Sequence, residues 1–267
     1  MSKLVYVSGD SFTSGDELAD TGLVGYPGLR PLKTVNPEID HIWFKKKPEI
    51  ASKLAFDLKA ESKKRSWPSK LESSAITVVN SSYPGNSMES ISKRVLLDLE
   101  RIVPDVVIIQ ITGISRLNYT ADTSPYFTAS CPIFAIDSIE CKSEIHRRIL
   151  KATAVSKTDD EFLIDYLYWL HIVNVTVKAK TGFYPILVDS CFLDRNRVYF
   201  ENINVKNNDL DILMSASRYN LVDKNSMSYF NKRLNTVNNV EYIMPLGHYA
   251  ENVHEEFATY IAETYLQ

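Results

Sequence analysis

The clearest pattern in the sequence is a series of short apolar runs rich in β-branched residues. Five such runs occupy residues 4–8, 76–80, 106–111, 184–188 and 240–244. Runs that are apolar throughout are typical of parallel strands buried on both faces. The sequence therefore predicts five strands of one parallel sheet.

Stretches with apolar residues on one helical face separate these runs. One stretch begins at Asn86, with Glu89 completing a capping box, and ends before Pro104. A second stretch begins at Pro48. A third covers residues 160–178 with Leu163, Leu167, Leu170 and Val177 inward, and a fourth closes the chain with Val253, Phe257, Ile261 and Tyr265 inward. Strands alternating with helices predict a three-layer α/β/α sandwich.

This order of elements predicts a single domain over residues 1–267. Two long connections, near residues 19–47 and 112–159, do not fit a minimal sandwich. Both follow the C-terminal ends of strands, where open α/β sheets bind their ligands. We expect them to be walls of a binding site, and the alternative is that they are plain surface loops.

Charge and composition narrow the function further. A net charge of −3 and a pI near 6.0 give no overall attraction for nucleic acid or an anionic membrane, which favours a small-molecule partner. No leader and no long apolar segment is evident, which predicts a cytoplasmic protein. Three cysteines without CxxC spacing argue against a zinc site, and no metal or cofactor is predicted.

The first strand leads directly into a candidate nucleophile. Residues 7–15 read VSGDSFTSG, so Ser11 follows the strand in a turn bordered by glycines. Such a turn exposes a hydroxyl and surrounds it with backbone N–H groups. The alternative is that Asp10, Ser11 and Thr13 are ordinary turn and helix-capping residues.

A candidate base lies at the other end of the chain. His248 follows the last predicted strand and precedes the last helix, so it can meet Ser11 across the crevice. An imidazole accepts a proton near neutral pH. The remaining histidines are weaker candidates, and His254 is expected to pack inside the last helix; the others are His41, His146 and His171.

Together these features resemble the SGNH (GDSL-like) hydrolase superfamily over nearly the whole chain. The motifs are Gly9-Asp10-Ser11, the segment NSSYPGNS over residues 80–87, Trp67-Pro68 before the second strand, and His248. The resemblance implies a flavodoxin-like sandwich and hydrolysis of carboxylic esters. Phage-encoded relatives are similar in the first and last motifs, which for a phage gene would imply association with the virion.

The sequence departs from this family pattern at two positions. Ser115 stands where the family has an oxyanion-binding asparagine, and Thr112, Asn86 or Asn118 could supply the donor instead. Pro245 stands where the family has the aspartate that orients the histidine. Because proline has no side-chain acceptor, the resemblance implies a Ser-His dyad that is slower than a triad or is compensated from elsewhere.

The resulting hypothesis is a serine ester hydrolase of a small-molecule or carbohydrate ester, such as an O-acetyl ester. The alternative is a catalytically weak or inactive binding or structural protein, and the oligomeric state stays open. The catalytic residues would be Ser11 and His248. The oxyanion hole would use Ser11, Gly85 and Ser115, and the substrate contacts would come from Asp10, Asn86, Thr112 and Arg116.

Overall fold

The computed structural model describes most of the predicted sheet. The described residues are 2–15, 62–83, 86–114, 116–120, 128–132, 148, 151–153, 155–190, 212–213, 215–216, 225–238 and 249–267. Among them, four parallel strands lie in the order β2-β1-β3-β6; they are β1 (Lys3–Ser8), β2 (Ile76–Asn80), β3 (Val106–Ile111) and β6 (Ile186–Asp189).

The predicted strands agree closely with these four. The bounds of β2 and β3 are as predicted, β1 starts one residue earlier, and β6 starts two residues later than the apolar run. The fifth predicted strand, residues 240–244, and the helix expected from Pro48 lie outside the described residues. The connection over residues 19–47 also lies outside them.

Strand β1 lies between β2 and β3 in the sheet. Val7 of β1 is in register with Asn80 of β2 on one side and with Ile108 of β3 on the other. From β1 the chain therefore continues to β2 on one side and then crosses over to β3 on the other side of β1. At such a switch point a crevice opens beyond the carboxyl ends of the two strands, here β1 and β3.

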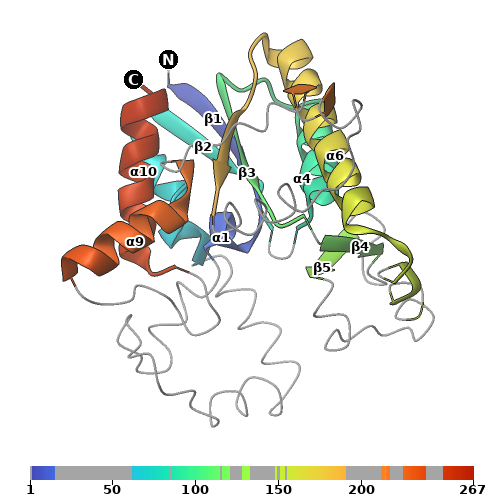
Figure 1. Ribbon diagram of the computed structural model, residues 1–267. Coiled ribbons are helices and arrows are strands. Elements are labelled where there is room, and N and C mark those ends of the chain that lie inside the picture. The colour runs from blue at the N-terminus through green and yellow to red at the C-terminus, as the bar shows by residue number, and fades with distance from the viewer. Residues whose placement is uncertain are drawn as a thin grey trace, which may run out of the picture.

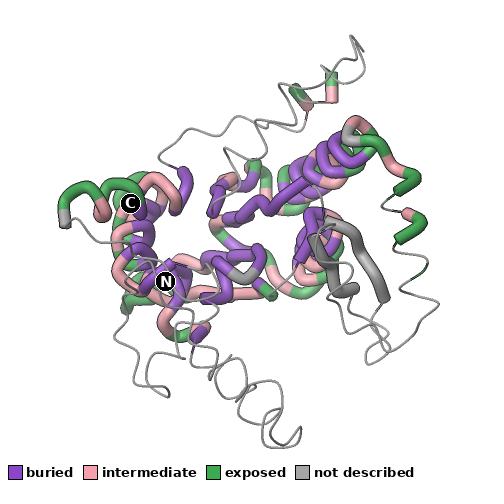
Figure 2. Tube along the Cα trace, turned by 60° about the horizontal axis from the view of Figure 1, so that its bottom comes forward, coloured by how far each residue is buried: buried purple, intermediate pink, exposed green. Residues whose placement is uncertain are grey.

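Helices cover both faces of the sheet, as a three-layer sandwich requires. On one face lie α4 (Met88–Asp98) and α6 (Asp159–Thr181), and on the other α9 (Met227–Asn238) and α10 (Glu251–Tyr265) (Figure 1). Alternate residues of β1 enter the two cores, Tyr6 on the α4 side and Val5 and Val7 on the α10 side. Burial is greatest in the two central strands, β1 and β3, whose residues 5–8 and 107–111 are buried and drawn purple in Figure 2, which explains their apolar sequences.

Helix α4 begins one residue later than a cap at Asn86 would allow, so that prediction was wrong. Ser87 is the cap, and its Oγ accepts a hydrogen bond from the Ser90 N–H at 3.2 Å. The Asn86 amide instead donates to the Gly9 carbonyl at 3.0 Å. A long-range hydrogen bond thus engages the side chain that the local sequence would place at the helix N-cap.

The two other described helices that were predicted are confirmed. Helix α6 extends slightly beyond residues 160–178, because Thr158 and Glu161 form a capping box at its start and Gly182, with φ of 85°, ends it. Its four predicted inward residues are buried, as are Val253, Phe257 and Ile261 of α10; Tyr265 is partly buried.

Several elements were not predicted. The connection over residues 112–159 contains an antiparallel pair, β4 (Arg116–Thr120) and β5 (Thr128–Pro132). The others are α9, the short α1 (Ser11–Ser14) and the 3-10 turn η2 (Ser69–Leu71). None of the helices in the described part of the chain is long and apolar enough to cross a membrane.

Candidate active site

The turn after β1 is built around a glycine that admits no side chain. A Cβ on Gly9 would lie 2.2 Å from Thr13 Oγ1 and 2.8 Å from the Cβ of Gln110. Both distances are far shorter than van der Waals contact, so glycine is required here for close packing of the turn on β3. Ser11 follows two residues later as the first residue of α1.

The Asp10 carboxylate fixes the turn that carries Ser11. Asp10 is fully buried, and its Oδ1 accepts from the Phe12 N–H at 3.1 Å and from Gln110 Nε2 at 2.6 Å. Its Oδ2 accepts from Thr112 Oγ1 at 3.0 Å. These three donors compensate the desolvation of a buried carboxylate and lock the backbone on either side of Ser11.

Gln110 holds the same turn at a second point. Its Nε2 donates to Asp10, and its Oε1 accepts from Thr13 Oγ1. Asp10 and Thr13 flank Ser11 and Phe12 in sequence, so one fully buried side chain of β3 restrains both ends of the turn. Sequence reasoning missed Gln110, for which the only available signal was a polar residue inside the apolar run 106–111.

The segment after β2 is tied to this turn by its backbone. The Gly9 carbonyl accepts from the Tyr83 N–H at 3.2 Å and from Asn86 Nδ2 at 3.0 Å. The Ser81 N–H donates to the Val7 carbonyl at 2.8 Å. The chain on both sides of residues 84–85 therefore lies against the Ser11 turn.

Two aromatic rings join the turn to the start of the last helix. Phe12, which follows Ser11, and Tyr249, which follows His248, are both buried, and their ring centroids lie 5.3 Å apart at 51°. Tilted pairs at this distance are favourable beyond the area they bury. The contact brings chain positions 12 and 249 together across more than two hundred residues of sequence.

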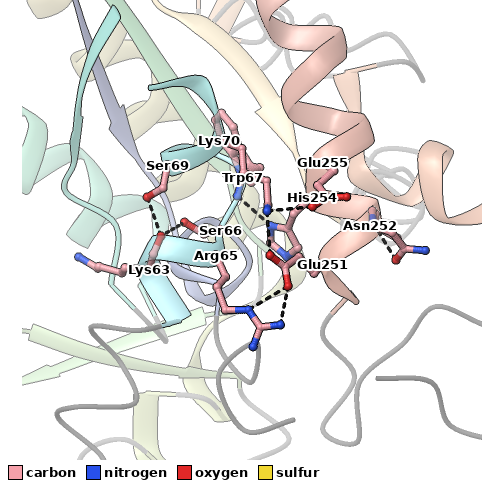
Figure 3. Close-up of polar contacts among 11 residues, drawn as sticks. Lys63, Arg65, Ser66, Trp67, Ser69, Lys70, Glu251, Asn252, His254 and Glu255 are labelled. Atoms are coloured by element: carbon pink, nitrogen blue, oxygen red, sulfur yellow. Dashed lines mark hydrogen bonds and ion pairs between the residues drawn. The ribbon is translucent and has the colours of Figure 1, made fainter. Parts of the chain in front are cut away.

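A polar clamp, made of Arg65, Trp67, Lys70, Glu251 and His254, fixes the first turn of α10, as Figure 3 shows. Glu251 accepts from Arg65 Nε at 2.9 Å and from Lys70 Nζ at 2.8 Å. Nδ1 of the fully buried His254 accepts from the Trp67 N–H at 3.1 Å, so this ring nitrogen carries no proton. The packing role expected of His254 is confirmed, because its ring is fully buried and accepts this bond from Trp67.

The charges of this clamp stabilise one another. Burial opposes the ionisation of Glu251, but the hydrogen bonds from Arg65 and Lys70 outweigh it and hold the pKa of Glu251 below its ordinary value. Burial likewise opposes the charge of Lys70, but its bonds to Glu251 and Glu255 raise its pKa. Glu251 therefore serves to dock α10 onto the Arg65–Lys70 segment.

The structure describes the other predicted site residues to different extents. The backbone of Ser11 and of Arg116 is described, at the start of α1 and of β4, but their side chains are not. Gly85, Ser115, Pro245 and His248 lie outside the described residues. Asp10, Asn86 and Thr112, predicted as substrate contacts, bond to the turn itself. The described residues contain no group of three or more side chains suited to hold a metal.

Comparison with known proteins gives structural likenesses only. No protein-family model and no curated protein matches the chain. Among solved structures, TesA aligns over 98% of this chain and 97% of its own, at 10% identity and a TM-score of 0.44. A member of the lipolytic protein G-D-S-L family from Veillonella parvula aligns over 100% of both chains, at 9% identity and a TM-score of 0.43.

A third similar structure is a catalytic mutant of an acetylxylan esterase from Geobacillus stearothermophilus. It aligns over 98% of this chain and 94% of its own, at 13% identity and a TM-score of 0.42. What the described residues define directly is a parallel α/β fold with a serine-bearing turn at the switch point of its sheet. The function has to be inferred from the residues of that turn.

Proposed function

We propose that this protein is a serine esterase that hydrolyses carboxylic esters of small alcohols or carbohydrates, with Ser11 as nucleophile and His248 as base. The observation that carries the proposal is the ring contact between Phe12 and Tyr249. Each ring belongs to the residue directly after a proposed catalytic residue, so the contact supports placing Ser11 and His248 on neighbouring segments. Consecutive Cα atoms are only about 3.8 Å apart.

The proposed reaction proceeds in two halves. The Ser11 hydroxyl attacks the ester carbonyl carbon while His248 accepts its proton, giving a tetrahedral oxyanion. The intermediate collapses as His248 returns the proton to the departing alcohol, leaving an acyl group on Ser11. Water then attacks the acyl-enzyme with His248 again as base, which releases the carboxylic acid and restores the serine.

In this proposal the oxyanion accepts hydrogen bonds from the Ser11 and Gly85 N–H groups, with the Ser115 hydroxyl as a third donor. Such donors are effective when they are already aligned before the charge develops. The bonds that Asp10 accepts from Phe12 and Gln110, and the bond that Asn86 donates to Gly9, support that alignment because they restrain the Ser11 turn and tie Asn86 to it. We therefore assign Asp10, Asn86 and Thr112 a positioning role, and Arg116 keeps its proposed contact with the substrate.

The proline at position 245 sets the expected rate. Loss of the orienting aspartate from a complete triad lowers turnover by about 10⁴. Glu251, an acid close to His248 in sequence, is engaged by Arg65 and Lys70. We therefore expect a slow esterase unless a backbone carbonyl or an acid from a long connection orients the imidazole.

The first prediction tests both catalytic residues with p-nitrophenyl acetate. Ser11→Ala and His248→Ala should each reduce hydrolysis to the uncatalysed background, because one removes the nucleophile and the other its base. The melting temperature should change little, which separates loss of chemistry from loss of fold. The matched controls are Ser156→Ala, at an exposed serine, and His171→Ala, whose ring contacts the Ala216 carbonyl. Activity within a few-fold of wild type in Ser11→Ala would show that another group does the chemistry.

A further inference from the structure

Helix α6 has an apolar outer face, which is unusual for a helix at the surface. Its inward residues belong to the core, whereas Ile164, Tyr168 and Val175 are 40%, 53% and 43% exposed. In α10, by contrast, the exposed residues are all polar; they are Glu255, Thr259, Glu263 and Thr264. Helices that are apolar on all sides are typical of buried positions. The outer face of α6 therefore has the composition of a covered surface.

These residues form one stripe along the helix. At about 100° per residue, Ile164 lies within about 40° of Tyr168, and Val175 lies within about 20° of it. The half-buried Ile172 lies within about 40° on the other side. We call residues 164, 168, 172 and 175 the α6 stripe, and its centre coincides with the middle of the helix. Figure 1 shows α6 on the side of the sheet away from α9 and α10.

The two ends of the α6 stripe carry charges of opposite sign. Asp160 and Glu161 lie before the stripe, and the exposed Lys178 lies after it. Asp160 and Lys178 are about five helical turns apart, so they lie on the same side of the helix. When a second α6 is laid antiparallel against the first, the acidic end of each stripe meets the basic end of the other. In a parallel pair, charges of the same sign would meet instead.

The stripe is complementary to itself under two-fold symmetry. In a closed dimer whose two-fold axis is perpendicular to α6, the two copies of the helix are antiparallel. Ile164 and Val175 lie at nearly equal distances on either side of the helix midpoint, as do Asp160 and Lys178. The rotation therefore places Ile164 of each copy opposite Val175 of the other, and Asp160 opposite Lys178, at both ends at once. Tyr168, next to the midpoint, lies close to the axis.

We propose that the α6 stripe is the contact surface of a homodimer in which two copies of α6 pack antiparallel. A helix of this length, about 35 Å, and about 10 Å of contact width offer roughly 350 Å² per copy, below the about 800 Å² per partner of a standard interface. We therefore expect a weak dimer that dissociates on dilution, with a Kd of about 10–100 µM. The proposal does not depend on the proposed esterase function.

The second prediction concerns sedimentation equilibrium of the full chain. The average molar mass should rise from 30.4 kDa toward twice that value between about 1 µM and about 500 µM protein. Tyr168→Asp should weaken the dimer at least about a hundredfold, because two aromatic side chains leave the centre of the contact and two like charges replace them. Val237→Asp, at a 74% exposed residue of α9, is the control and should change the Kd by less than about twofold.

Two charge reversals test the antiparallel arrangement. Asp160→Lys alone brings lysines together at both ends of the pair, and Lys178→Glu alone brings acids together, so each should weaken its own dimer about tenfold. A mixture of the two variants should regain association close to wild type, because each end of the mixed dimer again pairs an acid with a lysine. Lys178 also donates to the Gly182 carbonyl, so the melting temperature of each variant is measured separately from its association.

Four results would overturn the proposal. A molar mass of 30.4 kDa at every concentration would show that no dimer forms, and a dimer unaffected by Tyr168→Asp would have its interface elsewhere. A mixture of the charge variants that associates no better than either variant alone would exclude the antiparallel pair. Binding of the wild-type monomer, but not of Tyr168→Asp, to phosphatidylcholine vesicles would instead identify the α6 stripe as a lipid-binding surface.

Discussion

At the scale of single residues, Gln110 restrains both ends of the Ser11 turn. Its amide donates to Asp10 and accepts from Thr13, so its two polar atoms are both used in a fully buried position. Gly9 makes this arrangement possible, because any Cβ there would collide with Thr13 and Gln110. The geometry of the proposed nucleophile therefore depends on a residue about a hundred positions away in sequence.

The third prediction concerns Gln110→Leu, which keeps the volume but removes both hydrogen bonds. Leaving Asp10 and Thr13 with unmade bonds should lower the free energy of unfolding by about 1–3 kcal/mol. We expect kcat for p-nitrophenyl acetate to fall about tenfold with KM nearly unchanged, because misplaced oxyanion donors weaken the transition state more than the bound substrate.

Tyr6→Phe is the matched control for this variant. Tyr6 lies in β1, the strand that leads into the Ser11 turn, and its hydroxyl donates to Asp98 at 2.8 Å on the α4 side of the sheet. The control should lose stability but keep kcat. If Gln110→Leu behaved in the same way, with stability lost and kcat retained, Gln110 would be only a structural residue.

Sequence reasoning at this scale identified the turn but not its support. Gly9, Asp10 and Ser11 could be recognised because they are adjacent and follow an apolar run. Gln110 could not, because its partners are set by the pairing of β1 with β3, which no local pattern encodes. The same reason explains the error at Asn86, whose amide is used by the Gly9 carbonyl.

At the scale of elements, the position of α10 depends on the clamp to the segment before β2. The clamp contains the Arg65–Glu251–Lys70 ion pairs and the bond from Trp67 to His254. The Trp67 and Phe257 rings also pack in a T-shaped arrangement, with centroids 5.2 Å apart. Because α10 directly follows Tyr249 and Ala250, this clamp fixes the position of the described residues that come next after His248 in sequence.

The fourth prediction is a pH-dependent stability difference in Glu251→Gln. At pH 7 the variant should melt about 2–4 °C below wild type, corresponding to about 1 kcal/mol for a partly buried charge-assisted contact. The pKa of Glu251 is lowered in the folded state, so its contribution is complete above the ordinary glutamate pKa and is lost as pH falls through the folded-state pKa. The difference in melting temperature should therefore shrink toward pH 3.

Lys70 does not reverse this trend, because its raised pKa makes its contribution complete below the ordinary lysine value and removes it only in strong alkali. Glu263→Gln, at an exposed position of the same helix, is the control and should stay within about 1 °C of wild type at both pH values. A difference for Glu251→Gln that is as large at pH 3 as at pH 7 would contradict an electrostatic role for the clamp.

Helices and strands were predictable where burial is strong and local. The inward residues of α6 and α10 recur at helical spacing, and strand β3, buried from Val107 to Ile111, has the bounds of its apolar run. The β4–β5 pair was missed because neither strand is an apolar run, as the sequences RLNYT and TASCP show. Helix α9 was missed because its sequence, MSYFNKRLNTVN, is dominated by polar residues.

At the scale of the whole molecule, the fold brings distant segments to one edge of the sheet. The strand order β2-β1-β3-β6 places the ends of β1 and β3 side by side, and hydrogen bonds connect the segment after β2 to the same turn. The contact of Phe12 with Tyr249 adds the last part of the chain. The proposed nucleophile, oxyanion donors and base thus depend on one topological arrangement.

The central claim is that Ser11 is an activated nucleophile, and the fifth prediction tests it by labelling with a fluorophosphonate. Only a serine whose proton is taken by a base reacts quickly with this reagent. We expect one adduct per chain, located at Ser11 by peptide mass spectrometry and abolished in His248→Ala. An unlabelled wild-type protein, or an adduct on a different residue, would contradict the proposed esterase.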